Sequence, residues 1–239
     1  MIIRCVDFET TGTPTEDQRH ALCEVGWCDV AFEETDLADG FAVPILSEPK
    51  GFLVNPGRPI PPEARAVHHI SDADVAGAPG PDRACMTLAA GGAAYYAAHN
   101  SEFEASFFGS EVTWICTYKV ALRLWPDLPS HGLQYLRYAL PLDLDQALGL
   151  PAHRAVPDAY VGAVLLARII EEGRASLAEM VRWSSGRALL PRCPLKKYRD
   201  KLWADVPTDY LVWIVENIKD NPDVVANAKH HLKQRDALR

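Results

Sequence analysis

The stretch IIRCVDFET, residues 2–10, is an apolar, β-branched run that carries two acidic residues near its end and runs into the turn-forming TTG. Such a run predicts a β-strand. Side chains alternate across a strand, so Asp7 and Glu9 are expected on the same face. Two carboxylates at a strand's end suit hard divalent cations, which take oxygen ligands. The alternative is an ordinary strand edge with both acids in solvent, but charged groups inside an apolar strand need a partner.

Further segments predict an α/β sheet flanked by helices. Strands are expected at residues 22–32, 50–55, 93–99 and 112–116. One short helix is expected to start at Pro61-Pro62, a second to contain Leu88 and a third to follow Asn100. Further helices are expected over residues 117–125, 133–140 and 157–171. Strands come early and helices late, which is typical of a sheet covered by helices.

The composition changes near Gly173, and the sequence divides there into residues 1–173 and 174–239. The second part holds a helix at residues 176–183, the apolar-periodic DYLVWIVENI and a polar helix to the C-terminus. This part is at the small end for an independent core, so we expect it to pack on the larger domain.

Charge is unevenly distributed along the 239 residues, whose net charge is −8. Residues 1–150 carry 9 basic and 21 acidic side chains (net −12), and residues 151–239 carry 15 and 11 (net +4). The overall charge argues against indiscriminate coating of nucleic acid. The segment from Arg182 to Lys201 holds seven basic residues against Asp200 alone. It is either a polyanion-binding surface or a solvated basic loop.

No apolar run approaches the ~20 residues that span a bilayer, and the N-terminus lacks the apolar region of a signal peptide. We therefore expect a cytoplasmic protein without a membrane partner. The six cysteines are dispersed, without zinc-ligand spacing, and predict free thiols in a reducing compartment.

A second candidate site lies in HRAVPDA, where His153 precedes Asp158 by five residues. Pro157 suits the first turn of a helix, and an acid there faces the positive end of the helix dipole. Taken alone, the pattern fits helix capping with a surface histidine equally well.

Taken in order, VDFETTG, NPGRPIPPEARAVHHI, AHNSEFEASF and HRAVPDA resemble the histidine-containing (DEDDh) branch of the DEDD superfamily of 3′→5′ exonucleases. The ordered set is specific where any single piece is not. The segments WICTYKVALRLWP and PLKKYRDKLWADVPTDYLVWIVEN extend the likeness to the bacterial exodeoxyribonuclease X group. The resemblance implies a ribonuclease H-like fold: a mixed sheet of about five strands flanked by helices, with a small, mainly helical C-terminal module.

The resemblance also implies roles. Asp7, Glu9 and Asp158 match direct ligands of two Mg²⁺ or Mn²⁺ ions, and His153 matches the general base that takes a proton from the attacking water. Paired ions stabilise both the attacking and the leaving oxygens, and an imidazole titrates near neutral pH. The expected products are nucleoside 5′-monophosphates.

The fourth acid departs from the family pattern H-N-x-x-F-D, because the register places Glu104 where aspartate is usual. Glu102 falls at a variable position and is expected in solvent. The extra methylene moves the carboxylate by about 1.5 Å, a displacement that can cost about 100-fold in rate. We therefore expect an altered metal preference or a reduced rate.

Several residues are candidates for substrate binding. By resemblance, Thr10, Thr11 and Gly12 contact the terminal nucleotide, although a plain turn fits them too. Asn100 either binds substrate or caps the next helix, which is favoured, and Phe103 either stacks on a base or packs in the core.

In the tail, Lys196, Lys197 and Arg199 interleave with Tyr198 and Trp203, a composition suited to nucleic acid. His68, in the segment NPGRPIPPEARAVHHI, is expected to make a structural hydrogen bond.

The sequence thus predicts a metal-dependent 3′→5′ exonuclease acting on single-stranded DNA or frayed 3′ ends, in repair or degradation. An exoribonuclease on the same scaffold is the alternative enzyme, and recognition of the 2′-hydroxyl would decide between them. A catalytically weakened nucleic-acid-binding module is the alternative from another class, motivated by Glu104.

Overall fold

The computed structural model describes residues 1–14, 19–32 and 43–237. Its described strands are β1 (Ile2–Thr10), β2 (Leu22–Ala31), β3 (Ile45–Leu46), β4 (Lys50–Leu53), β5 (Tyr95–Ala98) and β6 (Trp114–Cys116). The central strand β1 pairs antiparallel with β2 and parallel with β5, which in turn pairs parallel with β6. Both β3 and β4 pair antiparallel with different parts of β2. These six strands therefore occupy five positions in a mixed sheet, which confirms the predicted fold class.

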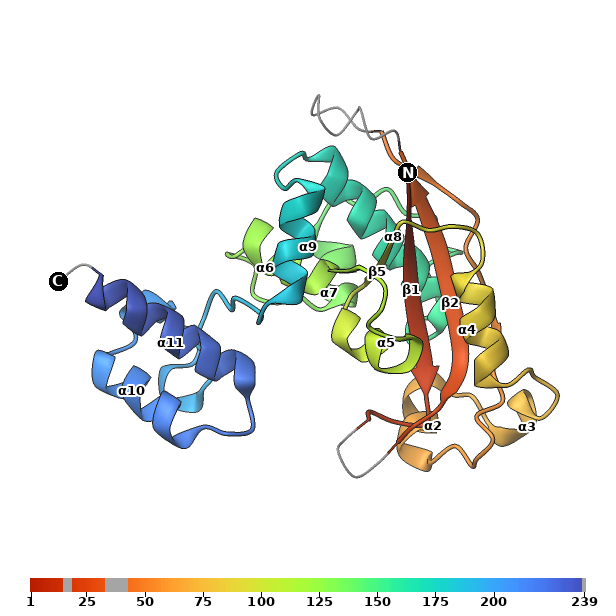
Figure 1. Cartoon of the computed structure of the whole chain (residues 1–239), viewed down its shortest axis with the longest axis horizontal. Coiled ribbons are helices and arrows are strands. Elements are labelled where there is room, and N and C mark those ends of the chain that lie inside the picture. Colours follow the sequence, from red (N-terminus) through yellow and green to blue (C-terminus); the bar gives the residue numbers. More distant parts are fainter. Residues whose placement is uncertain (15–18, 33–42, 238–239) are drawn as a thin grey trace.

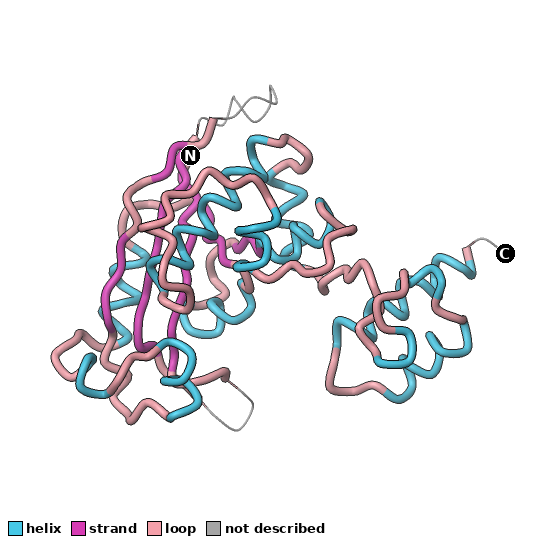
Figure 2. Tube along the Cα trace, turned by 180° about the vertical axis from the view of Figure 1, so that it is seen from behind, coloured by secondary structure: helices cyan, strands magenta, loops and turns pink. Residues whose placement is uncertain are grey.

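Helices cover the sheet (Figures 1 and 2). The described helices are α2 (Pro62–His68), α3 (Asp72–Val75), α4 (Pro81–Ala89), α5 (Ser101–Phe108), α6 (Thr117–Leu124), α7 (Leu133–Ala139), α8 (Ala155–Glu171), α9 (Leu177–Ser185), α10 (Thr208–Asn217) and α11 (Pro222–Asp236), with short 3₁₀ turns at Lys196–Tyr198 and Trp203–Asp205. The sequence missed α3, which is one turn long, and β3, which is two residues long.

The alternation of β1 separates two apolar cores. Ile3 and Cys5 join a cluster with residues of α6 to α9, such as Val120, Leu165 and Met180. Val6 and Phe8 face the other way, into a second cluster with α4 and α5. Asp7 and Glu9 share the parity of Ile3 and Cys5. The strand thus directs both acids to the face that carries α8.

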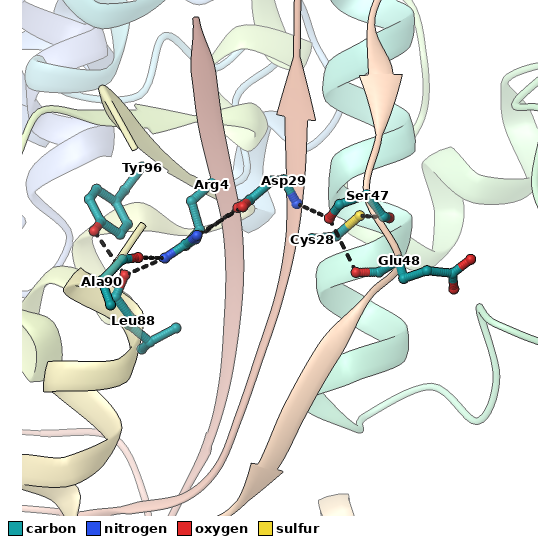
Figure 3. Close-up of polar contacts among 8 residues, drawn as sticks. All are labelled: Arg4, Cys28, Asp29, Ser47, Glu48, Leu88, Ala90 and Tyr96. Atoms are coloured by element: carbon teal, nitrogen blue, oxygen red, sulfur yellow. Dashed lines mark hydrogen bonds and ion pairs between the residues drawn. The ribbon is translucent and has the colours of Figure 1, made fainter. Parts of the chain in front are cut away.

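A buried arginine ties the sheet to α4 (Figure 3). Arg4 donates two hydrogen bonds to Asp29, its partner across the β1–β2 ladder, at 2.7 and 2.8 Å. It also donates to the carbonyl oxygens of Leu88 (2.6 Å) and Ala90 (2.5 Å) at the end of α4. Carbonyl groups at a helix C-terminus lack helical partners, so Arg4 satisfies them while its own charge is neutralised by Asp29.

The C-terminal part contains an apolar cluster of its own. Its buried members, such as Trp203, Leu211 and Val224, all follow residue 190. By contrast, Met180 of α9 lies in the core under the sheet. Figures 1 and 2 show α10 and α11 in a lobe beyond α9. The expected packing of the tail on the larger domain is therefore found for α9, while α10 and α11 pack on each other. The division at residue 173 stays a prediction.

Within the described residues, no helix is both long and apolar enough to cross a membrane. All six cysteines are free, and all but Cys85 are buried. The prediction of free thiols is confirmed.

Two glycines let the first turn of α8 lie directly on the sheet. A Cβ atom at Gly26 would lie 2.2 Å from both the carbonyl carbon and the oxygen of Ala155. A Cβ atom at Gly51, its ladder partner on β4, would lie 2.3 Å from Cγ2 of Val156. Since real Cβ atoms do not approach backbone this closely, only glycine at residue 26 permits the observed approach.

We predict that Gly26→Ala pushes the first turn of α8 off the sheet. Overpacking of this kind typically costs about 1–3 kcal/mol, to be measured as the free energy of unfolding in urea. Gly77→Ala is the matched control, because residue 77 has open space around its Cβ position. Equal stability of the two variants would contradict the proposed close packing.

Candidate active site

Three carboxylates meet where β1 ends and α8 begins. Asp7 and Glu9 come from β1, and Asp158 lies in the first turn of α8. One side-chain oxygen from each lies within 4.8 Å of the other two. The structure thus brings together residues about 150 positions apart, as the ordered motifs predicted. We call these three residues the acidic cluster.

Hydrogen bonds orient only one member of the acidic cluster. Oδ1 of Asp158 accepts a hydrogen bond from the Gln134 amide of α7 (2.6 Å), and Oδ2 accepts one from the His153 backbone N–H (2.8 Å). The carboxylates of Asp7 and Glu9 accept no hydrogen bond from any described residue. Their lone pairs are therefore free for a ligand.

Burial and mutual repulsion make the acidic cluster hard to ionise. Burial raises the pKa of Asp7 well above its usual value, and the charges of Glu104, Asp158 and Glu9 raise it further. Burial, Asp158 and Glu24 raise the pKa of Glu9 to about 8. The pKa of Asp158 is also raised by burial, although the His153 N–H opposes the shift. Such a cluster favours either a proton or a bound cation.

Glu104 of α5 adjoins the acidic cluster. Its side chain is 4% exposed, and its Oε2 atom has no hydrogen-bond partner. Burial, and then the charge of Glu9, raises its pKa to about 8, against a hydrogen bond from its own backbone N–H. An orphaned buried oxygen near Asp7 and Glu9 is what a fourth ligand-bearing residue would present.

Glu102 lies on the opposite side of the same helix. Its side chain is 60% exposed and accepts a hydrogen bond from Lys119 Nζ at 2.7 Å. The expectation that Glu102 lies at the surface is confirmed, and the structure adds the ion pair. Lys119 itself is buried and also donates to the carbonyl oxygens of Ser184 and Gly186 at the end of α9.

The donor set fits a hard divalent cation. All candidate ligand atoms are carboxylate oxygens, which Mg²⁺ and similar ions prefer at ~2.0–2.6 Å. Their spread of up to 4.8 Å is on the scale that such bonds span. Asp7, Glu9 and Asp158 therefore fit the metal dependence of the exonuclease superfamily that the motifs resemble.

Sequence reasoning missed the pair that holds the start of α8. Arg154 donates to both oxygens of Glu24 on β2, at 2.9 and 2.6 Å, and the Ala155 N–H donates to the same carboxylate at 3.0 Å. Glu24 is buried and lies directly opposite Glu9 in the β1–β2 ladder. The pair fixes the chain four residues before Asp158. Arg154 lies in the motif HRAVPDA, but no local sequence pattern indicates Glu24 as its partner.

His153 lies on the exposed loop before α8. Its backbone adopts φ of 60°, in the left-handed region that non-glycine residues rarely enter. This turn aims the His153 N–H at Asp158 and leaves the imidazole exposed. The histidine is therefore anchored to the acidic cluster through its backbone, with a side chain open to an incoming molecule.

A cleft of about 980 Å³ opens beside Glu9. The predicted substrate residues Thr10, Thr11 and Gly12 line it, together with Phe103. The Thr10 hydroxyl bonds within the turn to Gly12, and the Thr11 hydroxyl accepts from the Ala21 N–H. Both hydroxyls thus shape the turn.

Glycine is required at residue 12, where φ is 145°. His68 holds the turn from behind. Its Nδ1 accepts from the Ile70 N–H (3.0 Å), and its Nε2 donates to the Thr10 carbonyl oxygen (3.2 Å). The prediction of a structural hydrogen bond at His68 is confirmed.

The cations Arg19 and Arg58 also line the cleft. Arg58 donates a hydrogen bond to the Arg19 carbonyl oxygen, which holds these two residues together. Arg58 lies in the segment NPGRPIPPEARAVHHI, but no role was predicted for it from the sequence.

Two side-chain expectations are corrected or refined. Asn100 occupies the N-cap position of α5, but its side chain makes no capping hydrogen bond and is exposed. The favoured capping role is therefore wrong. Phe103 is half-buried, packs on Phe107 at 5.2 Å between ring centroids and still lines the cleft, so its two alternatives are both compatible with its position.

In the tail, Lys196, Lys197 and Arg199 are exposed, outside the cleft. Trp203 is 1% exposed and belongs to the module's core. Its predicted part in nucleic-acid contact is wrong, because the apolar packing of the module consumes the ring.

Residues 5–166 match the family model described as "Exonuclease". The chain belongs to this exonuclease family. It is also 31% identical over 241 residues to exodeoxyribonuclease 10 of Escherichia coli (strain K12), covering 97% of this chain and 99% of that protein. The predicted family and enzyme class are confirmed.

Solved structures agree with this assignment. The chain is similar to exonuclease X in complex with 5′ overhanging duplex DNA, with a TM-score of 0.63 and 31% identity, over 76% of this chain and 99% of the other. It also shares its fold with the nuclease domain of 3′hExo, a DEDDh family member, with a TM-score of 0.53 and 15% identity, over 72% of this chain and 92% of that one.

The raised pKa values predict how pH affects stability without metal. A carboxyl whose pKa is higher in the folded protein binds more protons there, so the free energy of unfolding falls as pH rises between the two values. For Glu9 and Glu104 this window runs from 4.5 to about 8. We expect metal-free protein to be less stable at pH 8 than at pH 5 in urea denaturation.

Added Mg²⁺ or Mn²⁺ should raise stability more at pH 8 than at pH 5, because protons compete with the cation for the same oxygens. Glu104→Gln removes one titrating group and should reduce the loss between the two pH values. A metal-free protein that is equally stable at both pH values would contradict this prediction.

Proposed function

We propose that this exonuclease hydrolyses phosphodiester bonds from the 3′ ends of DNA, single-stranded or frayed, and releases nucleoside 5′-monophosphates. The observation that carries the proposal is the buried acidic cluster, with Glu104 beside it, at the edge of a cleft with cationic side chains. Similarity to a protein named exodeoxyribonuclease 10, and to exonuclease X solved with DNA, supports DNA as the substrate.

Asp7, Glu9 and Asp158 would hold two divalent cations, Mg²⁺ or Mn²⁺, with Glu104 completing the acidic surround. When bound, such ions supply Lewis acidity that stabilises negative charge at the reacting phosphate. The chain's own contribution is to keep these carboxylates close, with those of Asp7 and Glu9 free of competing donors among the described residues. The extra methylene of Glu104 would change where the carboxylate oxygen of the fourth acid lies relative to the cations.

His153 would act as general base and take a proton from the attacking water onto an imidazole nitrogen. The position of the loop that carries His153 supports this role. The backbone N–H of His153 bonds to Asp158, so the loop that carries the imidazole moves with the acidic cluster. The exposed side chain can reach a water beside a substrate phosphate.

The substrate strand would lie in the cleft. The turn formed by Thr10, Thr11 and Gly12 contacts the terminal nucleotide, Phe103 stacks on a base, and Arg58 faces the phosphates. Lys196, Lys197 and Arg199 are proposed to contact the DNA backbone outside the cleft, and Asn100, exposed beside α5, remains a candidate substrate contact.

The first test uses DNA and RNA oligonucleotides labelled at the 5′ end, so that shortening from the 3′ end gives a ladder. With Mg²⁺ or Mn²⁺ we expect DNA to be shortened, and Asp7→Asn to lower the rate by at least about 100-fold, the scale for loss of a group that stabilises transition-state charge. Faster shortening of RNA would make the chain an exoribonuclease. If Asp7→Asn equals the wild type, or neither polymer is shortened, the proposed function fails.

A second prediction concerns the two glutamates of α5. Glu104→Gln should lower the rate by roughly 10- to 100-fold, because the site loses a charge, whereas Glu102→Gln, which keeps an acceptor for Lys119, should stay within about twofold. Glu104→Asp should keep or raise the rate with Mg²⁺. A more than tenfold loss in Glu104→Asp would show that the site is built around glutamate, and an equal effect of both Gln variants would remove Glu104 from the site.

A further inference from the structure

Three aromatic rings form a row on the surface of the C-terminal lobe. Tyr210 and Trp213, one turn apart on α10, stack with ring centroids 5.3 Å apart and an interplanar angle of 10°. Tyr198, from the preceding 3₁₀ turn, packs on Tyr210 at 4.7 Å. We call Tyr198, Tyr210 and Trp213 the aromatic row.

Only one ring of the aromatic row lies outside the lobe's core: Tyr198 and Tyr210 pack against the core cluster, and Trp213 does not belong to it. The buried side of α10 is formed by Leu211 and Ile214, which are fully enclosed. Trp213 is 44% exposed, and Tyr198 and Tyr210 are half-buried. A tryptophan stacked flat on a tyrosine at the surface leaves one broad ring face free for a planar group.

A cation lies over the same rings. Nζ of Lys197 is 5.0 Å from the Tyr210 ring centroid and 5.5 Å from that of Tyr198, within cation–π range. Lys196, Arg199 and Lys201 flank it along the chain and are exposed. None of these four cations forms an ion pair among the described residues.

The charge distribution favours a polyanion at this place. Residues 187–239 carry 11 basic and 7 acidic side chains (net +4), and residues 1–186 carry 13 and 25 (net −12). A nucleic acid strand is repelled by most of the exonuclease domain and attracted by this lobe. Stacked rings combined with unpaired cations are the chemistry that binds unpaired bases and their phosphates.

We propose that the aromatic row and Lys197 form a second nucleic-acid site, which binds single-stranded DNA apart from the catalytic cleft. A base stacks on the free face of Trp213, which Tyr210 supports from behind, and Lys197 with its neighbours contacts phosphates. The inference rests on the proposed function, because the strand held here is the substrate upstream of the 3′ end. The lobe then retains the substrate after each nucleotide is released.

The test is fluorescence anisotropy of the full chain with a 5′-fluorescein-labelled oligothymidylate of about 20 nucleotides, in EDTA. Removing metal prevents hydrolysis, so a failure of the proposed catalytic function leaves this binding test intact. Trp213→Ala should weaken binding about tenfold, the scale of one lost stacking contact. Trp213→Phe should restore most of the affinity. Val212→Ala, at a neighbouring position that is 40% exposed, is the matched control and should bind like the wild type.

Salt dependence separates the two parts of the site. Lys197→Gln should lower the slope of log Kd against log salt by about 0.7, the value for one phosphate contact on a single strand, whereas Trp213→Ala should leave it unchanged. Equal affinity of Trp213→Ala and Val212→Ala overturns the proposal. The proposal is also overturned if Trp213→Ala loses binding to anionic phosphatidylglycerol vesicles but not to DNA, because the occupant would then be a membrane surface.

Discussion

The arrangement of the site depends on how the first turn of α8 contacts β2. Glu24 binds Arg154 through both oxygens and accepts the Ala155 N–H, while Gly26 leaves room for the Ala155 backbone. Glu24 is buried while Arg154 is partly exposed, so loss of Arg154 would leave a buried carboxylate without its partner, which is unfavourable. The contact therefore fixes Asp158 against β1, and with it the spacing of the acidic cluster.

The strands β1 and β2 carry neutralised charges at one end of their ladder and unpaired acidic charge at the other. At one end Arg4 and Asp29 face each other across the ladder and neutralise each other. At the other end Glu9 faces Glu24, whose charge is taken up by Arg154, so Glu9 is left with other acids. The paired end stabilises the sheet. The unpaired end opposes folding unless protons or cations bind, and the apolar packing on both faces of β1 offsets that cost.

The sequence predicted those features that local pattern determines. The alternation of side chains in β1 predicted Asp7 and Glu9 on one face, and the order of the motifs predicted that Asp158 would lie near them. The Glu24–Arg154 pair spans 130 positions and has no local signal. Trp203 was misread because composition does not say which aromatic ring a small core will enclose; Trp213, ten residues later, is the exposed one. Asn100 has a capping residue's position without its hydrogen bond.

Helix geometry explains why Glu102 and Glu104 have different surroundings. Successive residues of an α-helix turn by about 100°, so side chains two positions apart point in nearly opposite directions. Since Phe103 and Phe107 pack toward the second core, α5 can present only one of the two glutamates to the acidic cluster. Glu104 faces inward, and Glu102 meets Lys119, whose other hydrogen bonds close the end of α9. A shift of α5 would therefore disturb the acidic cluster and the contact between α6 and α9 together, which couples the position of the fourth acid to the core of the domain.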